Sequence, residues 1–162
     1  MTLSVLKDVI VFLLAIYGAI LSTLNWWNAS RKDRRSVQVS LSTLVPTYNG
    51  GQTGRCFAKI EAVNVGHRPV TVTTLTVELP NGTRLWPVSF DLFPGFPDTR
   101  LPTTLSDGQS AHLTLPYADL ADGIRRGGYS EKTRVVPICQ DSAGNIYQGQ
   151  GWDVDPNEFA NM

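Results

Sequence analysis

Residues 9–27 read VIVFLLAIYGAILSTLNWW, and they set the architecture of the whole chain. The stretch contains no charged side chain. As an α-helix, its nineteen residues would rise ~28 Å, close to the ~30 Å hydrocarbon thickness of a bilayer. Trp26 and Trp27 fall where such a helix would leave the hydrocarbon, and indole rings favour that interface. The stretch therefore predicts a transmembrane helix within residues 1–30.

The side chains that we expect to face lipid are apolar or aromatic: Val9, Phe12, Leu13, Ile16, Ile20, Leu24, Trp26 and Trp27. A buried core helix and a cleaved signal peptide are the two alternatives. The length of the charge-free run disfavours the core helix. The signal peptide is disfavoured because Asp8 offsets Lys7 and because the small-residue pattern at 28–30 is a poor cleavage site.

The juxtamembrane segment 31–35 carries four basic residues against one acid: Arg31, Lys32, Arg34 and Arg35, with Asp33. Basic flanks are retained on the cytoplasmic side of a membrane helix. We therefore expect the N-terminus outside and the C-terminal domain in the cytoplasm, with an exported domain as the alternative. The same residues can contact anionic headgroups, worth about 1 kcal/mol for each basic residue near the surface.

Small residues recur at spacings of three and four along the predicted helix: Ala15, Gly18, Ala19 and Ser22. Small side chains let two helices approach closely in lipid, so this face predicts self-association or a protein partner. Small residues are also common in membrane helices that do not associate, so the pattern by itself is compatible with a monomer.

Residues 36–162 have the length of one soluble domain with its own core. The formal net charge is zero and only 17% of residues are charged, so stability must come mainly from apolar burial. The basic run beside the predicted helix has a membrane explanation, so nothing in the sequence predicts a nucleic-acid partner. No small-molecule substrate is evident either.

Alternating apolar and polar residues predict several short strands separated by turns. A change of phase between Val72 and Leu75 predicts a bulge, and Pro137 predicts an edge position or a bulge for its strand. The helical signal is confined to residues 117–126, where Gly127 follows the last turn. The last residues, 157–162, are the candidates for a segment without structure, although Trp152 and Phe159 could pack the tail back onto the domain. The predicted strands cover residues 36–43, 55–65, 70–79, 84–88, 112–115, 133–139 and 146–148.

This pattern predicts a mainly β chain: an N-terminal transmembrane helix, then an antiparallel immunoglobulin-like β-sandwich with one short helix. A small closed barrel is the alternative. Residues 62–82, AVNVGHRPVTVTTLTVELPNG, and 135–147, VVPICQDSAGNIY, resemble uncharacterised bacterial single-pass membrane proteins with an immunoglobulin-like domain. The resemblance implies a fold and a membrane tether, and it implies no activity.

Candidate chemistry is sparse. The two histidines, His67 and His112, lack a base, nucleophile and orienting group in any recognisable pattern, so we expect no enzyme and no catalytic residue. Cysteines and histidines are not spaced as metal ligands, and no cofactor is predicted. Cys56 and Cys139 are expected to be buried thiols in a cytoplasmic domain, whereas an exported domain could pair them.

Four aromatic residues in a proline-rich connection form the candidate partner surface: Trp86, Phe90, Phe93 and Phe96. The alternative is that they close one end of the core. The sequence thus predicts a single-pass, membrane-anchored binding or assembly module. An oligomeric membrane effector or accessory subunit, assembled through the transmembrane helix, is the alternative function.

Overall fold

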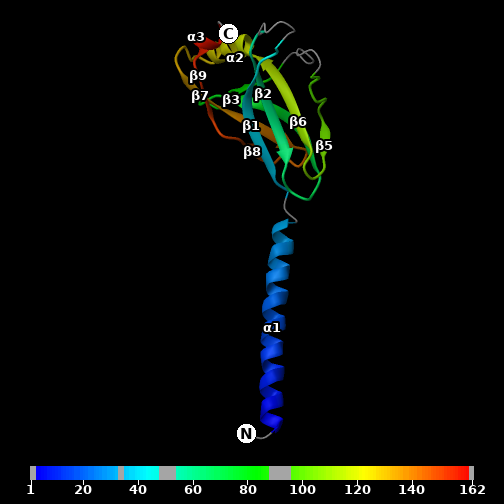
Figure 1. Cartoon of the computed structure of the whole chain (residues 1–162). Helices are drawn as coiled ribbons and strands as arrows, with labels where there is room; N and C mark the ends of the chain where they lie inside the picture. The colour runs from blue at the N-terminus through cyan, green and yellow to red at the C-terminus, as the bar shows by residue number, and fades with distance from the viewer. Residues whose placement is uncertain (1–2, 33–34, 48–53, 88–95, 161–162) are drawn as a thin grey trace. The chain divides into compact units, whose positions relative to one another are not determined.

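A computed structural model describes residues 3–32, 35–47, 54–87 and 96–160 (Figure 1). Within the first helix it describes the side chains of residues 7–29. The chain divides into two compact units, residues 1–34 and residues 35–162, and each is described by itself.

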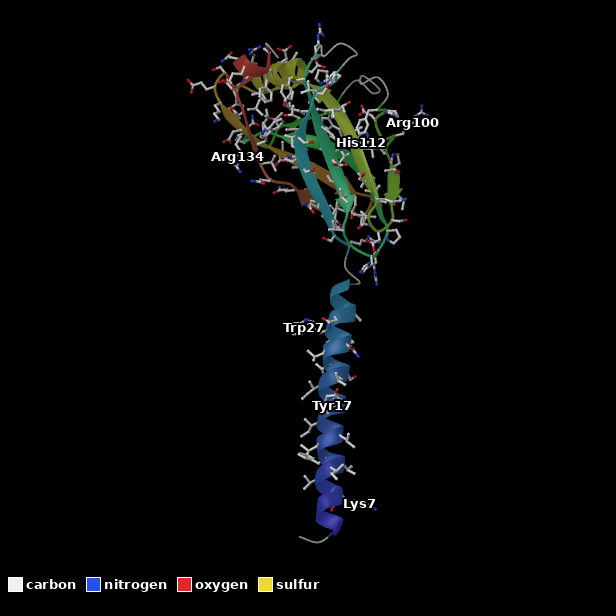
Figure 2. All side chains as sticks on the ribbon, in the orientation of Figure 1. Lys7, Tyr17, Trp27, Arg100, His112 and Arg134 are labelled. Carbon is white, nitrogen blue, oxygen red and sulfur yellow. The ribbon has the colours of Figure 1, made fainter. Side chains whose placement is uncertain are left out.

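The first unit contains one helix, α1 (Leu3–Lys32). Its segment Lys7–Ala29 is long and apolar enough to cross a membrane. Every described side chain in this segment is exposed, and Figure 2 shows Tyr17 and Trp27 pointing away from the helix axis. The predicted apolar helix is therefore confirmed in length and composition. The predicted basic flank lies largely outside the described side chains. Only one of its four basic side chains, that of Arg35, is described, and it is exposed.

The second unit contains two antiparallel sheets. The first has three strands in the order β1 (Val37–Leu44), β2 (Phe57–Asn64) and β6 (Ser110–Pro116). The second has the order β4 (Arg84–Leu85), β3 (Val70–Glu78), β7 (Thr133–Asp141) and β8 (Ile146–Gln148). Two further short strands join it, since β5 (Thr103–Leu105) pairs with β3 and β9 (Trp152–Val154) pairs with β7.

One hydrophobic core joins the two sheets, and the period-two pattern of the sequence explains it. In β1, Val37 and Val39 are buried while Gln38 and Ser40 are exposed, because successive side chains point to opposite faces. The largest fully buried side chains include Ile60, Leu75, Leu120, Ile124 and Val135. The prediction of a mainly antiparallel β domain is confirmed, but the domain has two short helices, α2 (Tyr117–Arg126) and α3 (Pro156–Phe159), where one was predicted.

Two local predictions for the second sheet have different outcomes. The bulge is confirmed, because the pairing of β3 with β7 shifts register between Val72 and Thr74. Pro137 was predicted at an edge or a bulge, and the edge position is wrong, since β7 has β3 on one side and β8 and β9 on the other. The bulge alternative fits, because two residues of β7, 136–137, lie opposite the three residues 149–151. Pro137 lies where β8 and β9 leave a gap, and its carbonyl accepts a hydrogen bond from Gly149 there. The absent N–H of proline faces that gap, so no ladder bond is lost.

The helix α2 (Tyr117–Arg126) has the predicted bounds and buries Leu120, Ala121 and Ile124 against the core. The predicted strand 84–88 is shorter, with pairing at Arg84–Leu85 only. The prediction of an unstructured tail is wrong for its first part, where a short helix, α3 (Pro156–Phe159), begins after Asp155 caps its first turn. The expectation that Phe159 packs the tail back is met, because its ring stacks on Tyr117 with ring centroids 4.1 Å apart.

Candidate functional site

The described residues of the predicted aromatic surface, Trp86 and Phe96, lie in different environments. Trp86 is 57% exposed. Phe96 is half-buried and stacks on His112, with ring centroids 4.3 Å apart. Phe90 and Phe93 lie outside the described residues. The structure therefore supports an exposed aromatic residue at Trp86, whereas Phe96 packs against the first sheet.

A hollow of about 430 Å³ lies beside Trp86, between β4, β6 and α2. Arg84 in its wall is paired with Glu78, with Nε and Oε2 3.0 Å apart. Asp119 and Arg126 bring charges of opposite sign to the same wall. Because the lining mixes charges and the opening is broad, this hollow does not select one class of ligand.

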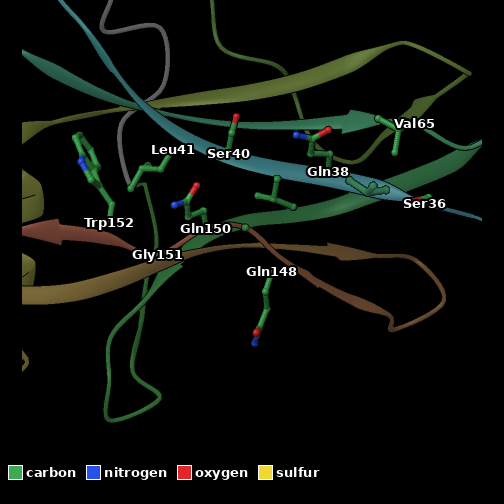
Figure 3. A pocket seen from close by; sticks show the side chains of 12 residues that line it. Ser36, Gln38, Ser40, Leu41, Val65, Gln148, Gln150, Gly151 and Trp152 are labelled. Atoms are coloured by element: carbon green, nitrogen blue, oxygen red, sulfur yellow. The ribbon is translucent and has the colours of Figure 1, made fainter.

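A larger groove of about 650 Å³ lies between β1 and the segment that joins β8 to β9 (Figure 3). We call it the edge groove. Figure 3 shows Gln150 pointing towards β1 and Gln148 pointing away from it. None of the twelve lining residues is charged: Ser36, Val37, Gln38, Val39, Ser40, Leu41, Val65, Gln148, Gly149, Gln150, Gly151 and Trp152.

The backbone of β1 alternates between its partner strand and the edge groove. The carbonyl of Ser36 accepts hydrogen bonds from the amides of Val65 (2.9 Å) and Gly66 (3.2 Å), on the β2 side. Because backbone groups alternate in an antiparallel pair, Gln38 and Ser40 also bond to β2, and Val37, Val39 and Leu41 direct theirs outwards. Gly149 confirms this, since a Cβ there would lie 2.3 Å from the carbonyl oxygen of Val39.

Asp141 holds the turn of the hairpin between β7 and β8, which precedes the groove-lining residues 148–152 in the chain. Its carboxylate accepts hydrogen bonds from the amides of Ala143 and Asn145 at 2.9 and 2.8 Å, from the Asn145 side chain and from the Tyr147 hydroxyl. Burial by itself would raise the pKa of Asp141, but these hydrogen bonds together lower it below its ordinary value. The carboxylate therefore fixes the turn before β8.

The opposite edge of the first sheet is covered. Asp98 and Thr99 lie along β6, where the Thr99 amide donates to the His112 carbonyl (2.9 Å) and the His112 amide donates to Thr99 Oγ1 (3.0 Å). Asp98, which is buried, accepts from both the amide and the hydroxyl of Thr114 at 2.8 and 2.9 Å. These bonds occupy the outward amide and carbonyl of His112 and the outward amide of Thr114.

The histidines occupy two separate sites. His67 lies in the predicted turn and pairs with Asp107, with Nδ1 and Oδ2 2.6 Å apart and both side chains exposed. His112 is half-buried beneath Phe96, and its Nε2 is buried without a hydrogen-bond partner in the described part of the chain. Lys59 lies 5.5 Å from the centre of the same phenylalanine ring, on the outer face of the sheet.

The cysteines are both free thiols. Cys139 is buried, and burial together with the nearby Asp141 carboxylate raises the pKa of its thiol to about 12. A thiol with this pKa is protonated at neutral pH and is a poor nucleophile. Cys56 is only half-buried at the start of β2, so the expectation of burial is met for Cys139 alone. Among the described residues, no group of three His, Cys, Asp or Glu side chains could hold a metal ion.

The edge groove was not predicted from the sequence. The first half of β1 is recognisable as a strand, but sequence alternation does not reveal which of its two edges is paired. No element was predicted for residues 149–151, Gly-Gln-Gly, which follow the predicted strand 146–148. One available signal was the absence of charge and proline from residues 37–44, which is unusual for an edge strand.

No protein-family model matches the chain, and no curated protein matches its sequence. Among solved structures, the chain is similar to an X-ray structure described as Northeast Structural Genomics Consortium target SoR45. The two are 10% identical, the match covers 74% of this chain and 86% of that one, and the TM-score is 0.29. This similarity carries no argument about fold or function, so both must come from the residues and geometry of this chain.

Proposed function

We propose that the protein is a single-pass membrane protein whose β domain serves as a binding or assembly module. One observation carries the proposal: the apolar segment Lys7–Ala29 leaves all its side chains exposed, while the domain after it buries a core of its own. Exposed apolar surface of this extent is unfavourable in water and favourable in a bilayer. The helix thus supplies location, and the domain supplies recognition.

The basic cluster at 31–35 supports a cytoplasmic domain and an external N-terminus. A reporter enzyme fused after Met162 tests this orientation in a bacterial inner membrane. We expect a cytoplasm-dependent reporter to be active and a periplasm-dependent reporter to be silent. Periplasmic activity would contradict the orientation. The matched control reverses the four basic residues to glutamate, which should weaken or invert the orientation.

The domain resembles an immunoglobulin-like sandwich in its strand order, and we propose this fold for it. The orders β1-β2-β6 and β4-β3-β7-β8 correspond to A-B-E facing C′-C-F-G, with α2 between E and F. A closed barrel would instead require β1 to pair with β8. Inter-strand amide NOEs check this point: a continuous ladder between residues 37–41 and 146–150 would indicate the barrel.

The small-residue face of α1 supports a second candidate function, an oligomeric membrane effector or accessory subunit. Thr23 donates its hydroxyl to the Ala19 carbonyl (2.8 Å), so this polar group needs no partner from another helix. Close approach of two helices at Ala15, Gly18, Ala19 and Ser22 would then be driven by packing. Disulfide cross-linking of Gly18→Cys in membranes tests it, with Ile20→Cys on the opposite face as control. Equal cross-linking of both variants would exclude this face as the interface.

A further inference from the structure

We propose that the end of the β domain at which β1 begins is a lipid-binding surface for anionic phospholipid headgroups. We call this end the N-terminal tip, and it consists of Arg35 and the loops 65–69, 106–109 and 142–146. The inference rests on the proposed function, because it requires α1 to lie in a bilayer. It adds a second, non-covalent contact with lipid, made by residues of the domain itself.

Strand pairing gathers these segments at one end of the domain. The start of β1 lies beside the end of β2, where Val37 pairs with Asn64. The Asn64 amide donates to the carbonyl of Gln109 (2.9 Å), which brings the loop before β6 to the same end. The Ser142 amide donates to the Thr71 carbonyl (2.8 Å), so the β7–β8 turn lies at the start of β3.

A buried asparagine holds two of the tip loops in place. Asn64 is fully buried, and its side-chain amide donates to the carbonyls of Arg68 and Leu105, both at 2.9 Å. Its side-chain oxygen accepts from the Gly66 amide (3.0 Å), and its backbone carbonyl accepts from the Gly108 amide (2.9 Å). The loops are therefore preorganised, which lowers the entropic cost of docking on another surface.

The exposed side chains of the tip suit the boundary between headgroups and acyl chains. Val65 and Ile146 are 52% and 49% exposed, and Arg35 and Arg68 are exposed basic residues. Aliphatic side chains gain by leaving water at a lipid interface, and guanidinium groups form bidentate hydrogen bonds with phosphate. The combination of aliphatic and guanidinium groups matches an anionic phospholipid.

The carboxylates among the described tip residues are already engaged within the domain. Asp107 pairs with His67, with Nδ1 and Oδ2 2.6 Å apart. Asp141, at the base of the β7–β8 turn, is buried and accepts hydrogen bonds from its own turn and from Tyr147. Partners in the domain therefore reduce the repulsion that these two carboxylates exert on an approaching phosphate.

The covalent tether favours the bilayer as the occupant. The strand β1 begins five residues after α1 ends, and five residues span at most ~18 Å. With α1 in a bilayer, the start of β1 meets headgroups at a high effective concentration, so weak contacts suffice for binding. The basic residues of segment 31–35 add attraction of the same sign for anionic lipid.

The test uses the full chain in phosphatidylcholine nanodiscs, with or without phosphatidylglycerol. A Cys56→Ser background removes the half-buried thiol, and an environment-sensitive fluorophore is attached at Ile146→Cys. The matched control is Lys132→Cys, an exposed site at the opposite end of β7, which spans nine residues or ~30 Å. A label at Ile16→Cys reports whether α1 lies in lipid.

We expect a blue shift and quenching by brominated lipid at position 146 in anionic nanodiscs, smaller effects in neutral ones, and neither at position 132. Arg68→Glu should abolish the quenching at 146, whereas Lys132→Glu should leave it unchanged. The comparison of lipids needs no charge substitution, so it decides even where Arg68→Glu does not fold.

Equal signals at positions 146 and 132, or equal signals in the two lipids, would overturn the proposal. Quenching at 146 that a folded Arg68→Glu variant retains would overturn it as well. When the label at position 16 is quenched in the same samples, such a failure leaves the membrane anchor intact. An unquenched label at position 16 would instead contradict the proposed function itself.

Discussion

The two edges of the three-stranded sheet differ in the hydrogen bonding of their outward backbone groups. At β6, the outward amide and carbonyl of His112 bond to Thr99, and the outward amide of Thr114 bonds to Asp98. At β1, the corresponding groups of Val37, Val39 and Leu41 face an uncharged groove. Both strands alternate apolar and polar side chains, so their sequences do not reveal the difference. The comparison teaches that residues distant in sequence decide how each edge is covered: side-chain and backbone hydrogen bonds cover β6, whereas the backbone of Gly149 lies against the Val39 carbonyl at β1.

The alternation of inward and outward backbone groups along β1 gives the largest expected effect on the free energy of unfolding. Ser40 directs its backbone to β2, where it pairs with Glu61, whereas Leu41 directs its backbone to the groove. Ser40→Pro removes a ladder bond inside the sheet and should lower the free energy of unfolding by about 3 kcal/mol or more. Leu41→Pro should cost no more than about 1 kcal/mol beyond Leu41→Ala, because proline is tolerated where the N–H faces outwards. Urea unfolding followed by tryptophan fluorescence measures both free energies. Similar losses would mean that the Leu41 N–H also has a hydrogen-bond partner within the domain.

Removing the cover from β6 should have the next largest effect. Asp98→Ala leaves the buried amide and hydroxyl of Thr114 without their acceptor. We expect a loss of about 2–4 kcal/mol in unfolding free energy, since an unsatisfied buried polar group costs about 1–3 kcal/mol. Asp98→Asn keeps one carbonyl oxygen and should lose less. Amide hydrogen exchange at Thr114 should accelerate in the alanine variant, and unchanged exchange would show that Asp98 does not close this edge.

Filling the gap at Gly149 tests the contact that limits the width of the edge groove. An added Cβ would lie 2.3 Å from the Val39 carbonyl and 2.8 Å from Pro137 Cγ. Because both obstacles belong to packed strands, Gly149→Ala should destabilise the domain by about 1–3 kcal/mol. The exposed neighbour Gln150→Ala is the control and should be close to neutral. A stable Gly149→Ala variant would mean that β1 and the 148–151 segment are farther apart.

Acid should weaken the turn between β7 and β8, with the smallest expected effect of the four. The folded pKa of Asp141 lies below its unfolded value of about 3.8, so its carboxylate contributes stability above that pH. This contribution is lost as pH falls through the lower, folded value. Asp141→Asn should be less stable than the wild type at neutral pH and should show a smaller decrease in acid. Parallel stability curves for the two proteins between pH 5 and pH 2 would show that another carboxyl dominates.

Much of the fold could be predicted because local patterns determine it. The charge-free run at 9–27 predicted an apolar helix, and α1 has the length and composition to span a membrane. The helix 117–126 was predicted to the residue, since its apolar face and the glycines after it are local signals. Period two placed β1, β2 and β3, and the change of phase at Val72 located the bulge. Orientation in the membrane and the identity of a partner stay predictions.

Tertiary structure alone decided which edges and which side chains are available. Pro137 predicts an edge position or a bulge, and only the structure shows that it lies in an interior strand, where β8 and β9 leave a gap beside it. Asp98 lies in a proline-rich connection and acts as a cap for Thr114, sixteen residues away. The edge groove joins residues 36–41 to residues 148–152. Alternation specifies the face on which a side chain lies, but the pairing of an edge depends on where distant segments meet, because a strand's backbone groups are chemically the same on both sides.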